Sequence, residues 1–106
     1  MTYQVAISKQ AKKDLQEIYE YIAFTLLSPQ NAAGKLEQLE KEIMELNYMP
    51  MRFREYEAEP WHSRGLRIMP VDNFVVLYVP DKETAVVTVI RVMYSGRDIE
   101  RQLSKS

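Results

Sequence analysis

Residues 64–93, RGLRIMPVDNFVVLYVPDKETAVVTVIRVM, carry the clearest indication of the fold class. They contain three apolar runs, of which the second is nearly continuous and the third is rich in β-branched residues, as β-strands are. Residues 70–73 and 80–83 separate the runs, and each begins with proline and contains aspartate, which favours a tight turn. Connections this short predict an antiparallel meander. The three predicted strands are residues 64–69, 74–79 and 85–93.

The chain before the meander predicts one strand and two helices. Residues 3–7 alternate between apolar and smaller or polar side chains, which indicates a short strand. Apolar residues then recur at helical spacing over residues 9–27, and again from Pro29 to about residue 50. Ser8 and Ser28 stand just before these two stretches, where serine commonly caps a helix N-terminus. Two amphipathic helices joined so closely should form an antiparallel hairpin.

A last short helix is expected from Ser95, because Ser95 and Asp98 have the spacing of a capping box. Ile99 and Leu103 would form its buried side. The order β-α-α-β-β-β-α predicts a single α+β domain over residues 1–106. In the simplest packing, the N-terminal strand joins a mainly antiparallel sheet, the helix hairpin covers one face of that sheet, and the opposite face stays partly open.

The composition excludes several kinds of chemistry. The chain has no cysteine, one histidine and three glycines. Disulfides and thiolate chemistry are therefore excluded, a multi-histidine metal site cannot form, and no glycine-rich phosphate loop is present. We expect no metal or other cofactor. The apolar runs are too short to span a membrane and the N-terminus lacks a signal-peptide pattern, so we expect a cytoplasmic protein without a membrane partner.

All seven arginines lie within residues 49–106, and two of them stand out. Arg91 interrupts a β-branched strand, where regular alternation would put it on the same face as Val89 and Met93. A charge in such a run must reach solvent or find a partner, for which Asp98 is a candidate. Arg97 stands near a helix N-terminus, where a cation is mildly disfavoured, so its position suggests a specific partner.

Trp61 and His62 form a second cluster. Tryptophan beside histidine could stack on a nucleic-acid base or close the edge of the core, and packing is the more common role of a lone tryptophan. His62 is the only side chain whose ordinary pKa lies near neutrality, which makes it a candidate base as well as an ordinary surface residue.

Three segments together resemble the toxins of the RelE/ParE superfamily. They are residues 3–15, the Gly65–Arg67 tripeptide that leads into Tyr78, and above all the ending RVMYSGRDI at residues 91–99, which is similar to the ParE-like ending. The resemblance covers nearly the whole chain, including the helix hairpin and the meander. It implies a small toxin that is neutralised by a cognate antitoxin, whose extended tail wraps the toxin.

The superfamily has two main activities, and the resemblance leaves both open. ParE-like members poison DNA gyrase and are not known as nucleases, so they need only a binding surface. For this chain the target contacts would be Arg91, Arg97, Trp61 and His62. RelE-like members enter the ribosome and cut mRNA, which requires proton transfer and stabilisation of the phosphate charge.

Under the mRNA-cutting interpretation, Arg67, Arg91 and Tyr94 fall at roughly the places of the catalytic residues. His62 or Glu55 would then have to act as the general base.

The loop before the meander departs from the RelE-like pattern. Arg52 and Arg54 replace an expected pair of lysines, and arginine is a poor general base because it does not deprotonate in proteins. We therefore predict a gyrase poison, which would have no enzymatic activity if the chain is ParE-like. The alternative is a ribosome-dependent mRNA endoribonuclease, and a third interpretation is a non-toxic module that only binds its antitoxin.

Overall fold

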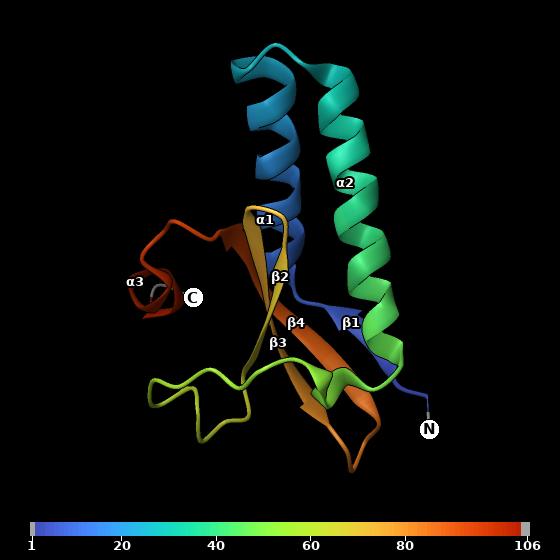
Figure 1. Cartoon of the computed structure of the whole chain (residues 1–106), viewed down its shortest axis with the longest axis vertical. Coiled ribbons are helices and arrows are strands. Elements are labelled where there is room, and N and C mark those ends of the chain that lie inside the picture. Colours follow the sequence, from blue (N-terminus) through green and yellow to red (C-terminus); the bar gives the residue numbers. More distant parts are fainter. Residues whose placement is uncertain (1, 105–106) are drawn as a thin grey trace.

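The computed structural model describes residues 2–104, and its elements follow the predicted order (Figure 1). The strands and helices are β1 (Gln4–Ile7), α1 (Lys9–Glu20), α2 (Pro29–Met44), β2 (Arg67–Val71), β3 (Phe74–Asp81), β4 (Val86–Tyr94) and α3 (Ile99–Ser104). A π-helical turn (Tyr21–Thr25) follows α1, and two short 3₁₀ turns (Glu45–Asn47 and Pro50–Arg52) follow α2. The predicted α+β class is confirmed.

The four strands form one sheet in the order β1-β4-β3-β2. The meander β2-β3-β4 is antiparallel as predicted, and β1 lies parallel to β4. At the β2 edge, the Ile68 N–H donates to the Arg54 carbonyl (3.1 Å) and so faces away from β3. Pro70 occupies the next outward position and has no N–H, which leaves this edge a poor template for a further strand.

The main core lies between the helix hairpin and one face of the sheet. Helix α1 buries Ala11, Leu15 and Ile18 there, and α2 buries Leu39 and Ile43, because their apolar residues recur on one side of each helix. The hairpin also extends well beyond the sheet, so its tip stands at one end of the molecule (Figure 1).

Ser8 fastens the start of α1 to the sheet. Its hydroxyl accepts a hydrogen bond from the Ala11 N–H (3.1 Å), which confirms the predicted cap, and donates to the Ile90 carbonyl in β4 (3.0 Å). Ser28 stands at the predicted N-cap position of α2, but its side chain makes no capping hydrogen bond. One serine therefore caps a helix and joins it to a strand, whereas the other only marks a helix start.

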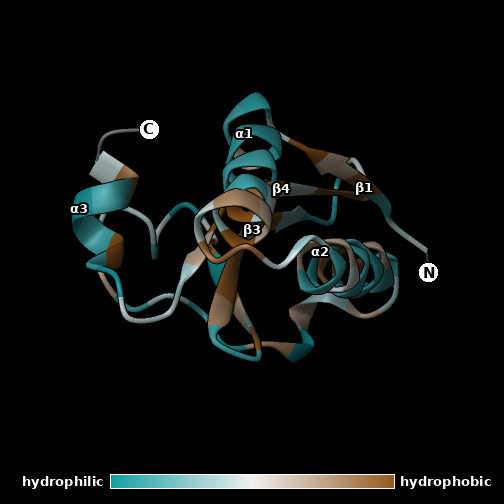
Figure 2. Cartoon of the chain, turned by 90° about the horizontal axis from the view of Figure 1, so that it is seen from above, coloured by the Kyte–Doolittle hydropathy of each residue, from teal (hydrophilic) through white to brown (hydrophobic). Residues whose placement is uncertain are grey.

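The second face of the sheet is covered by a smaller core, so the expectation that it stays partly open is wrong. A smaller core forms there around Leu66, Val75 and Leu77, and Leu103 of α3 and Trp61 of the long loop pack against it. Seen from above, α3 and α2 lie on opposite sides of β3 (Figure 2). Burial on both faces explains why β3 is an almost continuous apolar run.

A β-bulge in β4 overturns the expected side-chain alternation. The register pairs Tyr78 with Val89 and Leu77 with Arg91, so Ile90 is the extra residue. Val89 packs into the main core, whereas Met93 packs into the smaller one. The two residues therefore do not share a face, because the additional residue shifts the period of two by one position.

Several predicted boundaries also shift. The α-helical geometry of α1 ends at Glu20 and continues to Thr25 as a π-helical turn rather than to Leu27. Strand β2 begins at Arg67 and not at Arg64, because residues 61–65 form turns. Pro70 lies inside β2 and not in the turn after it. Helix α2 ends at Met44 rather than near residue 50, and α3 begins at Ile99 rather than at Ser95.

Tyr78 anchors the loop that follows the hairpin. It is fully buried in the main core, and its hydroxyl donates a hydrogen bond to the Pro50 carbonyl (2.5 Å). Burial raises the pKa of Tyr78 to about 12 from an ordinary value of 10.0, although the charges of Arg67 and Arg52 oppose the rise. The neutral phenol is therefore the form that stabilises the fold.

This arrangement predicts an alkaline dependence of stability. At pH 8, Tyr78→Phe should lose about 1–3 kcal/mol of unfolding free energy, because the buried Pro50 carbonyl loses its donor. In the wild type the contribution of Tyr78 is present below pH 10 and is lost as pH rises toward 12. Urea unfolding at several pH values should therefore show that the difference in unfolding free energy between the wild type and Tyr78→Phe disappears over that range. A difference that stays constant would contradict this account.

Candidate functional site

A groove of about 810 Å³ lies where the end of α1, the end of β4 and the segment before α3 meet. Its lining includes Asp14, Glu17, Tyr21, Arg91, Tyr94 and Arg97. Three of the site residues predicted from sequence, Arg91, Tyr94 and Arg97, are thus brought together. The groove opens beside the place where α1 packs on β4, so the last turns of the helix and the end of the strand both line it.

Arg91 is bound to Asp14 in a buried ion pair. Its Nε and Nη2 donate to the two carboxylate oxygens at 2.7 and 3.0 Å, and both residues are more than nine-tenths buried. The Val92 N–H also donates to Asp14 (3.0 Å), and Arg91 Nη1 donates to the Gln102 carbonyl in α3 (3.0 Å). A single guanidinium therefore joins α1, β4 and α3.

Asp98 is not the partner of Arg91, so that prediction is wrong. The Asp98 carboxylate instead accepts a hydrogen bond from the Arg101 N–H (3.3 Å) and caps α3, the role that the sequence predicts for Ser95. Asp14 was missed because an aspartate within a helix usually lies in solvent. The available signal was its spacing, three residues after Ala11 and four before Ile18, which puts it on the apolar face.

Aromatic rings form one wall of the groove. The Tyr94 ring packs against Phe74 with centroids 4.4 Å apart, and it meets Tyr21 edge-on at 6.4 Å. Tyr94 is half-buried and sits in the main core, so the ring is held rigidly while it still faces the groove. Such a wall suits apolar or aromatic groups of a partner.

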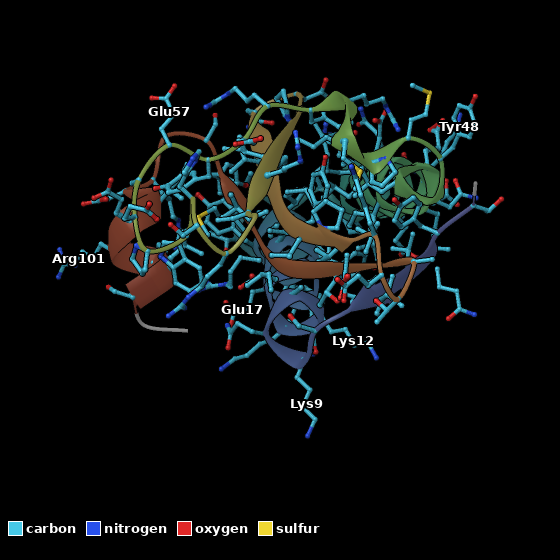
Figure 3. All side chains as sticks on the ribbon, turned by 90° about the horizontal axis from the view of Figure 1, so that it is seen from below. Lys9, Lys12, Glu17, Tyr48, Glu57 and Arg101 are labelled. Atoms are coloured by element: carbon cyan, nitrogen blue, oxygen red, sulfur yellow. The ribbon has the colours of Figure 1, made fainter. Side chains whose placement is uncertain are left out.

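Arg97 contributes an exposed positive charge to the same groove. Within residues 2–104 its side chain makes no hydrogen bond or ion pair, so the specific partner expected from sequence is not found in that part of the chain. Glu17 also lines the groove, where it lies 4.0 Å from Lys13 and points outward from α1 (Figure 3). The groove therefore combines a free cation with an apolar wall.

Arg67 lies away from this groove and serves the loop before the meander. Its guanidinium donates to the carbonyls of Met51 (3.1 Å) and Phe53 (2.7 Å), and it lies 3.3 Å from the Glu55 carboxylate. Its side chain is 19% exposed, and these bonds hold the loop against the start of β2. The residues expected to form one RelE-like catalytic set are thus in two places.

Trp61 and His62 also lie outside the groove. Trp61 packs against the smaller core and lies under the Arg64 guanidinium, 4.9 Å from the centre of its ring, in agreement with the packing interpretation. His62 Nδ1 is 2.9 Å from the Tyr56 carbonyl and 3.7 Å from the Glu55 carboxylate. The two bases proposed from sequence therefore contact each other rather than the arginines of the groove.

The described part of the chain contains neither a metal-binding cluster nor a membrane-spanning helix. Residues 2–104 contain no group of three or more histidine, aspartate or glutamate side chains arranged to hold a metal ion. Among the same residues, no helix is both long and apolar enough to cross a membrane.

Comparison with known proteins identifies the family. The family model described as the ParE toxin of the type II toxin–antitoxin system ParDE matches residues 5–99. The chain belongs to this family. The match includes the ending in which Arg91, Tyr94 and Arg97 lie, and the ParE-like toxin that the sequence resembles is thereby confirmed. Among curated protein sequences, no match to the chain is found.

Solved structures of toxin–antitoxin proteins share the fold. The chromosomal ParDE system from P. aeruginosa superposes with a TM-score of 0.71 at 16% identity, over 88% of this chain and 96% of that chain. The RelBE2 complex from Mycobacterium tuberculosis gives 0.65 at 20% identity, over 89% and 99%. The isolated E. coli RelE toxin gives 0.59 at 19% identity, over 97% and 96%. ParE and RelE proteins therefore share one architecture with this toxin.

The buried ion pair should dominate the stability of the toxin. Asp14→Ala should cost about 3–5 kcal/mol, because it leaves the Arg91 guanidinium buried without its counter-charge. Glu17→Ala, one turn further along the same helix and exposed, should change stability by less than about 0.5 kcal/mol. Urea unfolding of the two variants tests this contrast, and similar losses in both would show that the pair has no special role.

Proposed function

We propose that this ParE-family toxin acts by poisoning DNA gyrase and is not a nuclease. The separation of the RelE-like residues is the observation that carries the proposal. Arg67 pairs with Tyr78 across the sheet and Tyr94 pairs with Phe74. Phe74 and Tyr78 are four residues apart along β3, which is roughly 13 Å of strand. A scissile phosphate in contact with Tyr94 would thus lie beyond the reach of Arg67 in its present position.

The state of Arg91 also supports a binding function. A catalytic arginine must direct donors at the charge that develops on the phosphate. Here Nε and Nη2 of Arg91 are bound to Asp14 and Nη1 is bound to Gln102, so using them in catalysis would break the bonds that join three elements. A toxin that only binds its target needs no such rearrangement.

A supercoiling assay with purified gyrase tests the proposal. The toxin should inhibit supercoiling and trap cleaved DNA, and the cognate antitoxin should relieve the effect. Tyr94→Phe should inhibit gyrase as the wild type does, because it keeps the ring that packs on Phe74 and removes only a hydroxyl. If folded toxin arrests growth while gyrase keeps its full activity, the proposal fails.

mRNA cleavage remains the second function, because the groove places Tyr94 beside a free cation, Arg97. A tyrosine hydroxyl and a guanidinium could serve proton transfer and charge stabilisation at a phosphate. In that case Tyr94→Phe should slow cleavage of ribosome-bound mRNA by about 10²–10³-fold without loss of stability. The same variant thus separates the two functions.

We further propose that a cognate antitoxin neutralises the toxin by occupying the groove. The ParDE and RelBE structures that share the fold are toxin–antitoxin systems or complexes. The groove offers a partner segment an aromatic wall at Tyr21 and Tyr94 together with the charge of Arg97. An antitoxin segment with apolar side chains and a carboxylate matches this combination.

Calorimetry with the cognate antitoxin at two salt concentrations tests this placement. Arg97→Ala should weaken binding about tenfold, because one exposed charge pair is lost, and Arg97→Glu should weaken it further through repulsion. Affinity should fall only moderately with salt, since apolar contacts provide most of the binding. Arg101→Ala is a matched control, because Arg101 is exposed on α3 but does not line the groove. Equal effects of the two substitutions would rule out the groove.

A further inference from the structure

The tip of the helix hairpin is an exposed apolar knob. Four side chains form this tip surface, and their exposed fractions are 45% for Tyr21, 67% for Phe24, 54% for Leu26 and 82% for Leu27. Viewed from above, the ribbon that joins α1 to α2 is brown and white, the colours of apolar and intermediate residues (Figure 2). Exposed apolar residues that gather in this way commonly mark an interaction site.

The backbone of the tip is fixed and strained. The Leu26 N–H donates to the Tyr21 carbonyl (3.0 Å) and closes the π-helical turn, and the Ser28 N–H donates to the Ile22 carbonyl (3.1 Å). Leu27 has a φ of 53°, in the left-handed region that favours glycine or asparagine. A large apolar side chain at such a position costs stability, and strain of this kind is concentrated at functional sites.

The charge pattern restricts the kind of partner. No Asp, Glu, Lys or Arg occurs between residues 21 and 34, although 27% of the whole chain is charged. The nearest charged residues on α1, Glu17 and Glu20, are exposed and acidic. Nucleic acids and anionic membranes both select basic surfaces, so neither suits this tip. An apolar protein surface does suit an uncharged apolar tip of this kind.

The shape of the tip restricts the partner further. The tip projects at one end of the longest axis of the molecule, which extends over 43 Å (Figure 1). A projecting knob is buried well only by a concave surface, which a folded domain can provide and an extended tail cannot. A second copy fits poorly, because two knobs cannot enclose each other and four side chains fall short of the roughly 800 Å² per partner that a stable dimer buries.

We propose that the tip inserts into a concave apolar pocket on the folded protein that the toxin inhibits. The inference rests on the proposed function, under which that protein is gyrase. The tip then binds the target, while the groove beside Arg97 binds the antitoxin. Phe24 and Leu27 are the anchors of this contact, because they are the most exposed apolar residues of the tip and do not line the groove.

A double variant of the full-length toxin, Phe24→Ser with Leu27→Asn, tests the inference. Asparagine adopts the left-handed conformation readily, so the fold should persist with an unchanged melting temperature. The matched control is Met44→Ser with Tyr48→Ser, which removes two apolar side chains that are 53% and 64% exposed near the other end of the hairpin. Tyr48 lies far from α3 and its Arg101 (Figure 3).

The tip variant should need at least about 100-fold more protein to inhibit supercoiling, since buried anchors dominate such contacts. It should also lose growth arrest, and it should keep antitoxin affinity by calorimetry, while the control variant behaves as the wild type throughout. Inhibition by the tip variant at the wild-type concentration would overturn the inference. So would an equal loss of antitoxin affinity, which would make the tip an antitoxin surface.

Two further measurements separate this inference from the proposed function. If the wild type arrests growth but leaves gyrase active, the proposed function fails. Growth arrest by the tip variant then becomes the measurement that tests the inference. A folded tip variant that still arrests growth overturns the inference, whereas a harmless one supports it. Analytical ultracentrifugation tests whether a second copy of the toxin occupies the tip instead. If the wild type is a dimer and the tip variant is a monomer, the tip is a self-association surface and the inference is overturned.

Discussion

The ion pair between Asp14 and Arg91 determines how the rest of the toxin is arranged. Arg91 directly follows the bulge at Ile90 in β4, and its guanidinium binds Asp14 on the buried face of α1. The same guanidinium reaches the Gln102 carbonyl, and the Asp14 carboxylate accepts the Val92 N–H. Burial of these charges is tolerable only because each has several partners. The pair therefore joins α1, β4 and α3, and Asp14, Arg91 and Gln102 all line the groove.

The arginines of this small protein divide into two groups by what their donors contact. Arg67 and Arg91 direct their guanidinium groups at carbonyls and carboxylates of their own chain and hold a loop and a helix in place. Arg97 instead presents its charge to solvent in the groove. Arginine suits both tasks because its planar fork makes several bonds at once and always carries a charge. Of these three arginines, only Arg97 is free to recognise a partner.

The two proposed binding surfaces are physically different. The groove is concave and combines an aromatic wall with a cation, which suits a segment that folds upon binding. The tip is convex and uncharged and is held by a π-helical turn, which suits a rigid pocket. Because Tyr21 and Leu26 belong to both surfaces, an antitoxin in the groove would lie beside the target-binding tip. Neutralisation by steric exclusion follows naturally from this proximity.

The order of elements, the helix hairpin, the antiparallel meander and the family could all be predicted from the sequence, because they depend on local periodicity, turn residues and an ordered motif. The sequence also located Arg91, Tyr94 and Arg97, but not the partner of Arg91. The folded structure was needed to identify Asp14 as that partner, since a contact across 77 residues leaves no local signal beyond one helical spacing. It was likewise needed to identify the bulge, the covered second face and the separation of Arg67 from Tyr94. Each depends on how strands pair and which surfaces meet, and periodicity within one element cannot specify that.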